Sequence, residues 1–210
     1  EVHRLIEERK QKFVLSGSSA RKLKRGASNL LAGRAEVCHL FPLVSKEVGF
    51  TRSVDEALEH GMLPMAVTGD RPESFLRAYV ETYLREEVQA EALVRQIGGF
   101  ARFLEVAARM NGQVVNASGV ARDAGVARRT VQDYFQILVD TLIGSWLPAW
   151  KLKKPAKQVA HPKFYLFDCG VARHLAGFGH LSVHPEERGA LLETYVLHEI
   201  RAYLHYNDLH

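Results

Sequence analysis

The stretch that decides the fold lies at residues 117–143 and reads ASGVARDAGVARRTVQDYFQILVDTLI. Residues 117–124 predict a short helix, Gly125 predicts a tight turn, and residues 128–143 predict a longer helix with apolar side chains at helical spacing. We expect Val126 and Val131 to fill the gap between the two helices. The pattern is that of a helix-turn-helix.

The start of the second helix holds the first candidate contacts with nucleic acid. Its apolar residues face inward, which leaves Arg128, Arg129, Thr130, Gln132 and Asp133 exposed, and all of these except Asp133 are candidate DNA contacts. Helix-turn-helix proteins present base-reading side chains at this end of the helix, and guanidinium groups suit phosphate by charge and by bidentate geometry. The alternative is that the arginine pair is only solvated.

A basic stretch at residues 151–157 follows the predicted helices. It predicts a strand pair that would form the wing of a winged helix, and it adds the candidate DNA contacts Lys151, Lys153 and Lys154. Winged helices also serve as protein–protein scaffolds, so the motif alone leaves the class of partner open.

Composition and charge place the chain among ordinary globular proteins. Of its 210 residues, 47% are hydrophobic and 25% are charged, and 28 basic against 24 acidic residues give a net charge of +4. Such a mild excess does not by itself indicate nucleic acid. No uncharged run approaches the roughly 20 residues of a membrane span. The two cysteines, Cys38 and Cys169, fit a reducing compartment, so we expect a cytoplasmic protein.

The N-terminal part predicts the carboxyl edge of a parallel α/β sheet. Residues 13–15 form an apolar run that ends in small polar residues and precedes a basic helix, and residues 37–40 predict a further strand. Ligands of such sheets bind at the carboxyl ends of the strands. Ser16 would therefore contact a phosphate or orient a water there, or it would only cap the next helix.

Two expected absences bear on chemistry. The sequence contains no G-x-x-x-x-G-K-[ST] motif, so we expect no nucleotide hydrolysis by this chain alone. The ten histidines form no H-E-x-x-H pair, and His198-Glu199 predicts an exposed helix face rather than two metal ligands. We therefore expect no metal site.

Four segments together resemble a large group of prokaryotic AAA+-type predicted ATPases. Residues 13–48 resemble the end of the ATPase domain, and residues 117–150, 161–177 (HPKFYLFDCGVARHLAG) and 187–200 (ERGALLETYVLHEI) resemble the C-terminal domain of unknown function attached to it. The resemblance covers nearly the whole chain in order. It implies that the nucleotide-binding motifs lie upstream of residue 1, in a longer protein that uses ATP and Mg²⁺.

The same resemblance suggests roles for individual residues. It makes Ser16 a sensor of the γ-phosphate and Arg34, within LAGR, an arginine finger that reaches a nucleotide in its own or a neighbouring subunit. A structural salt bridge is the equal alternative for Arg34. Glu193 would stand on the first helix of a restriction-endonuclease-like core whose further acidic and lysine residues would come after His210, so no nuclease chemistry is assigned.

The expected fold is α+β and predominantly helical. Its expected parts are the end of an AAA+-type ATPase domain (1–52), a helical bundle (53–110), a winged helix-turn-helix (111–158) and an incomplete nuclease-like domain (159–210). We expect it to couple ATP binding and hydrolysis to a partner, with double-stranded DNA, another protein or a second copy of the chain as candidates. The alternatives are a nucleotide-independent winged-helix binding module and a folded fragment without activity of its own.

Overall fold

The chain forms two compact units, Glu1–His39 and Leu40–His210. The computed structural model describes residues 2–14, 36, 38–83, 97–149 and 162–209. Ser16, Arg34, Lys151, Lys153 and Lys154 lie outside these described residues, so the roles expected for them stay predictions.

The described residues of the first unit form one helix, α1, at Val2–Arg9. The strands expected at residues 13–15 and 37–40 are wrong for the residues described: Phe13 and Val14 are not in a strand, nor are Cys38 to Leu40. Val14 is 98% exposed and Leu40 is 93% exposed. A strand needs a neighbour to take its backbone hydrogen bonds, and the described part of this unit contains no second strand.

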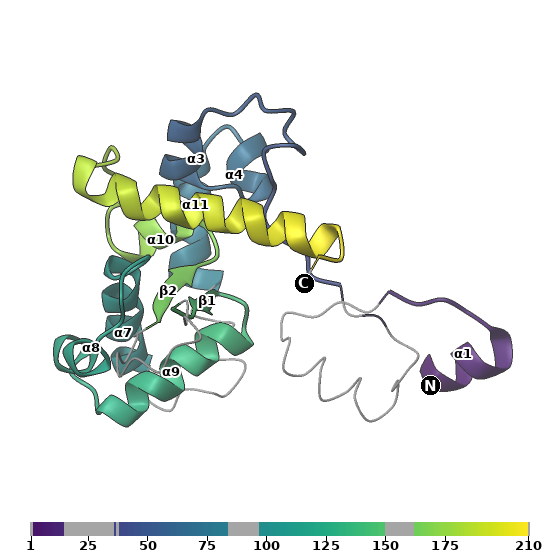
Figure 1. Cartoon of the computed structure of the whole chain (residues 1–210), viewed down its shortest axis with the longest axis horizontal. Helices are drawn as coiled ribbons and strands as arrows, with labels where there is room; N and C mark the ends of the chain where they lie inside the picture. The colour runs from purple at the N-terminus through teal and green to yellow at the C-terminus, as the bar shows by residue number, and fades with distance from the viewer. Residues whose placement is uncertain (1, 15–35, 37, 84–96, 150–161, 210) are drawn as a thin grey trace, which may run out of the picture. The chain divides into compact units, whose positions relative to one another are not determined.

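The second unit is mostly helical, as expected, and Figure 1 shows its elements in chain order from blue to yellow. Its described elements are α3 (Val54–His60), α4 (Pro64–Thr68), α5 (Pro72–Ala78), the π-helical turn η1 (Tyr79–Tyr83), α7 (Ile97–Arg109), α8 (Ala117–Ala124), α9 (Arg128–Asp140), β1 (Gly144–Leu147), β2 (Lys163–Leu166), α10 (Cys169–Leu175) and α11 (Pro185–Tyr206).

One apolar core runs through most of the second unit. It includes Ala66 on α4, Phe103 on α7, Leu138 on α9 and Ala176 at the end of α10. Helix α10 contacts α3, α5, α7, α11 and β2, so it lies at the centre of the unit. The core contains residues on both sides of positions 110 and 158, where we expected domain boundaries. The positions of the domain boundaries stay predictions.

A small antiparallel sheet completes the second unit, so the fold is α+β. Strands β1 and β2 pair with Gly144 opposite Leu166 and Leu147 opposite Lys163. An isolated antiparallel bridge also joins Val114 to Lys163, so the residues just before α8 lie alongside the start of β2. The apolar strand expected near residues 164–167 is therefore confirmed, and it pairs with the strand that follows α9.

Among the described helices, none is long and apolar enough to cross a membrane.

Candidate nucleic-acid interface

The predicted helix-turn-helix residues form two helices joined by a tight turn, α8 and α9. Asn116 caps the start of α8, because its side-chain oxygen accepts hydrogen bonds from the backbone N–H groups of Ser118 (3.1 Å) and Gly119 (3.3 Å). Gly125 ends α8 in the left-handed conformation with φ of 65°, which glycine adopts without steric cost. The second helix ends at Asp140, three residues before the end predicted for it.

Aromatic packing fixes which side of α9 faces the core. The ring of Tyr134 meets Phe100 edge-on at a centroid distance of 5.0 Å, and Phe135 meets Phe103 at 4.9 Å and Phe164 of β2 at 4.7 Å. Burial raises the pKa of Tyr134, with the nearby Arg102 acting in the opposite direction. These contacts hold α9 against both α7 and the sheet.

The opposite side of α9 is polar and open to solvent. Arg128, Arg129 and Gln132 are exposed and Thr130 is half-buried, so the structure brings these four predicted residues together at one helix end. The first turn of α9 contains no acidic residue, and Ala127 at its start makes no side-chain capping bond. The first turn of α9 therefore combines uncapped backbone N–H groups with two exposed arginines, a combination that favours an anion.

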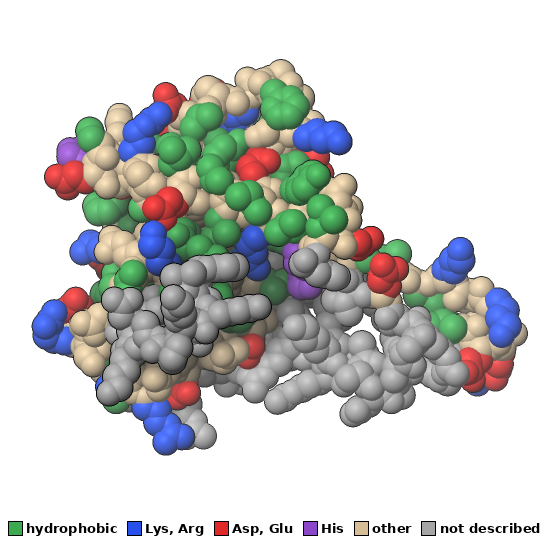
Figure 2. All heavy atoms as spheres, in the orientation of Figure 1, with side chains coloured by type: hydrophobic (Ala, Val, Ile, Leu, Met, Phe, Trp, Pro, Cys, Tyr) green, Lys and Arg blue, Asp and Glu red, His purple; other side chains and the backbone are tan. Residues whose placement is uncertain are grey.

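The charge around this helix start is modest. Arg122 is paired with Asp123 at 3.0 Å, and Lys163 is paired with Glu193 at 2.6 Å, whereas neither Arg128 nor Arg129 has an ion-pair partner among the described residues. On the face drawn in Figure 2, basic side chains are scattered among acidic ones rather than gathered into a single patch. Any affinity of this surface for a polyanion therefore depends on a small number of basic side chains, chiefly Arg128 and Arg129.

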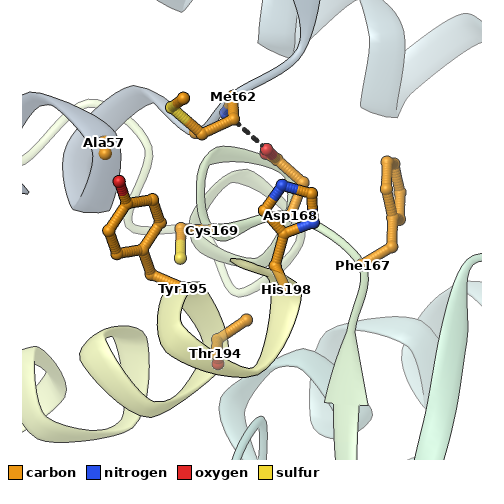
Figure 3. A pocket seen from close by; sticks show the side chains of 9 residues that line it. Ala57, Met62, Phe167, Asp168, Cys169, Thr194, Tyr195 and His198 are labelled. Atoms are coloured by element: carbon orange, nitrogen blue, oxygen red, sulfur yellow. Dashed lines mark hydrogen bonds between the residues drawn. The ribbon is translucent and has the colours of Figure 1, made fainter. Parts of the chain in front are cut away.

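A second group of polar side chains lies at the centre of the unit, around Asp168 (Figure 3). Asp168 caps α10: one carboxylate oxygen accepts a hydrogen bond from the N–H of Val171 at 3.0 Å, and the other accepts one from the N–H of Met62 at 2.6 Å. Burial raises the pKa of this carboxyl group, while the hydrogen bonds from Met62 and Val171 and the nearby His198 act to lower it.

Many enzymes use aspartate, cysteine and histidine side chains in catalysis, and Asp168, Cys169 and His198 lie together here. The space between them is too small for a substrate. The cavity between them measures about 10 Å³, which is at the lower limit for one water molecule. The thiol of Cys169 donates to the carbonyl of Leu191 at 3.3 Å, and burial raises its pKa well above the ordinary value. A protonated, enclosed thiol is a poor nucleophile, so this group holds α3, α10 and α11 together.

Sequence reasoning missed most of these buried polar residues. Arg173 is only 1% exposed, and its guanidinium donates to the carbonyls of Glu59 and Phe178 at 3.2 and 3.1 Å. The expectation of an exposed face at His198-Glu199 is wrong: His198 is buried, and its Nε2 bonds to the carbonyl of Leu43 at 3.0 Å. Only Asp168, an N-cap residue directly after an apolar strand, carried a local signal.

The absence of a metal site, expected from the sequence, stays a prediction for the chain as a whole. The described residues contain no group of three or more His, Cys, Asp or Glu side chains placed to hold a metal ion. Ser16 and Arg34, which the ATPase resemblance assigns to the nucleotide, fall in residues 15–35, outside the described part of the chain.

Comparison with known families places the larger part of the chain in one family. Residues 51–182, which include α3 to α10, match the family described as "Domain of unknown function (DUF8612)". The chain belongs to this family. Residues 1–49 match the family described as "AAA domain", which supports the expected AAA-type ATPase fragment at the N-terminal side of the DUF8612 domain.

Two similar mycobacterial proteins extend the same relationship over nearly the whole chain. They are "Uncharacterized protein Rv2008c" of Mycobacterium tuberculosis and "Uncharacterized protein Mb2031c" of Mycobacterium bovis, each 28% identical over 204 residues. Each alignment covers 95% of this chain and 46% of the relative, so the chain spans about half the length of these proteins. No solved structure was found to match the chain.

Proposed function

We propose that this chain is the C-terminal part of an AAA-type ATPase whose DUF8612 domain couples ATP binding and hydrolysis to double-stranded DNA. The observation that carries the proposal is the combination of the AAA match at residues 1–49 with the exposed arginines at the start of α9. The sequence holds no phosphate-binding loop, so the nucleotide would be bound by residues of a longer polypeptide, with Mg²⁺.

The order of elements supports a winged helix as the DNA-binding part. A helix (α7) is followed by the residues around Val114, by the helix pair α8 and α9, and by the antiparallel strands β1 and β2. Winged helices combine a helix-turn-helix with such a hairpin. The wing would then lie at the residues that join β1 to β2, which include the basic stretch 151–157.

The features at the start of α9 favour DNA as the partner over an acidic protein. Arg128 and Arg129 are adjacent, exposed and without an ion-pair partner among the described residues, and they belong to the first turn of α9, which has no side-chain cap. Guanidinium groups and a helix N-terminus both bind phosphate well. Because the free cations are few, we expect weak, salt-dependent binding to duplexes without strong preference for sequence.

Fluorescence anisotropy with a labelled random duplex tests the DNA part. Replacing both Arg128 and Arg129 by Ala removes two phosphate contacts, so the slope of log affinity against log salt should fall by about two. The matched control replaces Arg71 and Arg77, two exposed arginines of the α5 region, by Ala. DNA as the partner would be contradicted if the affinity for the duplex did not change with salt concentration. Equal losses of affinity in the two double variants would contradict it as well.

ATP turnover tests the nucleotide part. The longer polypeptide, with the upstream residues restored, should hydrolyse ATP in the presence of Mg²⁺, and Arg34→Ala should lower turnover by about a thousandfold if Arg34 acts as an arginine finger. A variant with unchanged turnover would leave Arg34 with a structural salt bridge. If the wild-type longer polypeptide shows no turnover, the nucleotide-independent binding module becomes the better description.

A further inference from the structure

The sequence match to the AAA family extends past the boundary between the two structural units. The match extends to residue 49, whereas the structural division falls between His39 and Leu40. Residues 41–48 therefore belong by sequence to the AAA match and by contacts to the unit that contains α11. We call these residues the exit segment.

Helix α11 holds the exit segment through several polar contacts. One carboxylate oxygen of Glu199 accepts hydrogen bonds from the backbone N–H of Ser45 at 2.7 Å and from its hydroxyl at 2.8 Å. The Ser45 hydroxyl also shares a hydrogen bond of 2.5 Å with the hydroxyl of Tyr195. Burial of that phenol raises its pKa, and it remains a neutral hydrogen-bonding partner near physiological pH.

Further contacts extend this attachment in both directions. Nearer the N-terminus of the exit segment, the N–H of Phe41 donates to the hydroxyl of Tyr206 at 3.2 Å, and its ring lies 5.3 Å from that of His205. Between these points, His198 bonds to the carbonyl of Leu43. The contacts run from Tyr195 to Tyr206, about three turns of α11, so the exit segment cannot shift along this helix without breaking several of them.

The same helix also contacts the sheet that follows the helix-turn-helix. Arg201 donates to the hydroxyl of Ser145 on β1, and Glu193 accepts from Lys163 (2.6 Å) and from the hydroxyl of Tyr165 (2.8 Å) on β2. Strand β2 in turn packs against α9 through Phe164 and Phe135. In Figure 1, α11 is the long yellow helix that crosses this unit between α3 and the sheet.

We propose that α11 is the coupling element of the molecule: it transmits movement of the exit segment to the β1–β2 sheet and so to α9, with Ser45 and Glu199 as the positioning pair. A helix is stiff along its axis, and its contacts with the exit segment and with the sheet lie on one continuous element. This inference rests on the proposed function, because it takes the AAA part as the source of movement.

Hydrogen exchange on the present chain tests whether the positioning pair holds the exit segment. Loss of a hydrogen bond to a charged group should raise the exchange rates of the amides of residues 41–48 about tenfold in Ser45→Ala and in Glu199→Ala. The matched control is Glu186→Ala, which removes an exposed carboxylate from the first turn of the same helix. Exchange rates that are equal in all three variants would overturn the proposal.

The longer polypeptide tests the transmission itself. In the wild type, ATP should change the exchange rates of the amides of β1 and β2, and in Ser45→Ala and Glu199→Ala this change should be at least halved while ATP turnover stays within twofold. An ATP-dependent change that persists in full, with turnover intact, would overturn the coupling role alone. Absence of turnover in the wild type would overturn the proposed ATPase function, and the coupling role with it.

Discussion

The helix-turn-helix and the layer around α10 and α11 share apolar packing but differ in their buried polar contacts. Helix α9 is held by rings, with Tyr134 and Phe135 packed against four other aromatic side chains, and its outer side makes no contact with the core. The layer around α10 adds three buried polar groups to its apolar packing, and each of them is bonded to the backbone of a distant segment: Asp168, Arg173 and His198. Apolar packing leaves the outer surface free for recognition, whereas directional bonds fix the relative positions of helices.

The largest effect should come from Asp168. Replacing it by Ala leaves the buried N–H groups of Met62 and Val171 without an acceptor, and should lower the free energy of unfolding by about 3 kcal/mol. The matched control is Asp133→Ala on the exposed side of α9, with an expected change below about 0.5 kcal/mol. Urea unfolding measures both, and equal effects would contradict the contrast between the two regions.

The same carboxyl group should also give an unusual pH dependence. Because burial raises its pKa in the folded state, its contribution to stability is complete below the ordinary pKa and is lost as the pH rises through the raised value. Wild type should therefore lose stability relative to Asp168→Asn as the pH rises above the ordinary pKa of an aspartate, about 4. The other carboxyl groups are common to both proteins, so their titration cancels in this difference.

A smaller effect is expected at the turn of the helix-turn-helix. Gly125 has a φ of 65°, where a Cβ atom is strained, so Gly125→Ala should lower the free energy of unfolding by about 1 kcal/mol. Gly189→Ala is the matched control, because Gly189 lies in α11 with open space around it. Alanine favours helix there, so thermal unfolding should show a small gain in stability. A loss at Gly189 as large as that at Gly125 would contradict the role given to the turn.

A salt-sensitive effect is expected at Glu193, an exposed carboxylate that bridges α11 and β2. The hydrogen bond from Lys163, followed by that from Tyr165, holds its pKa below the ordinary value. Its contribution is therefore present above the ordinary pKa and is lost as the pH falls through the lowered one. Because the pair is largely exposed, Glu193→Gln should cost less than about 1 kcal/mol at neutral pH, and 1 M salt should reduce this cost.

The smallest effect concerns the acid beside the arginines of α9. Asp133 is exposed one turn after Arg129, so it would repel a phosphate bound at the start of α9. Asp133→Asn should raise the affinity for random duplex DNA by about twofold at low salt, since one exposed charge interacts weakly through water. Asp123→Asn is a less favourable control because Asp123 is paired with Arg122; Asp70→Asn, in the loop before α5, serves better. Equal gains in both would indicate only an effect of net charge.

The contrast between the two regions also explains how much the sequence could predict. Residues 117–143 carry their signals locally: the spacing of Val120, Val131 and Leu138 sets the buried face, and Gly125 sets the turn. Helix, turn and exposed arginines all followed from these signals, and the start of α9 was predicted to the residue. The apolar strand near Phe164 was predicted for the same reason.

The polar layer could not be predicted in this way, because its partners lie far apart along the chain. Asp168 and Met62 are separated by 106 residues, and His198 and Leu43 by 155. A histidine and a glutamate in a helix give no local sign that a distant loop will cover them. The strand expected at residues 13–15 failed for a related reason: an apolar run becomes a strand only beside another strand, and the described residues around it supply none.

The environments of the two cysteines make the chain ready for site-specific labelling. The sequence has two cysteines, Cys38 and Cys169. Cys169 is buried against α11, whereas Cys38 is exposed next to the boundary between the two units. A maleimide dye added to the folded protein should therefore modify Cys38 alone. Such a dye would report on motion at the boundary without any engineered substitution, and its emission could be followed while nucleotide or duplex is added.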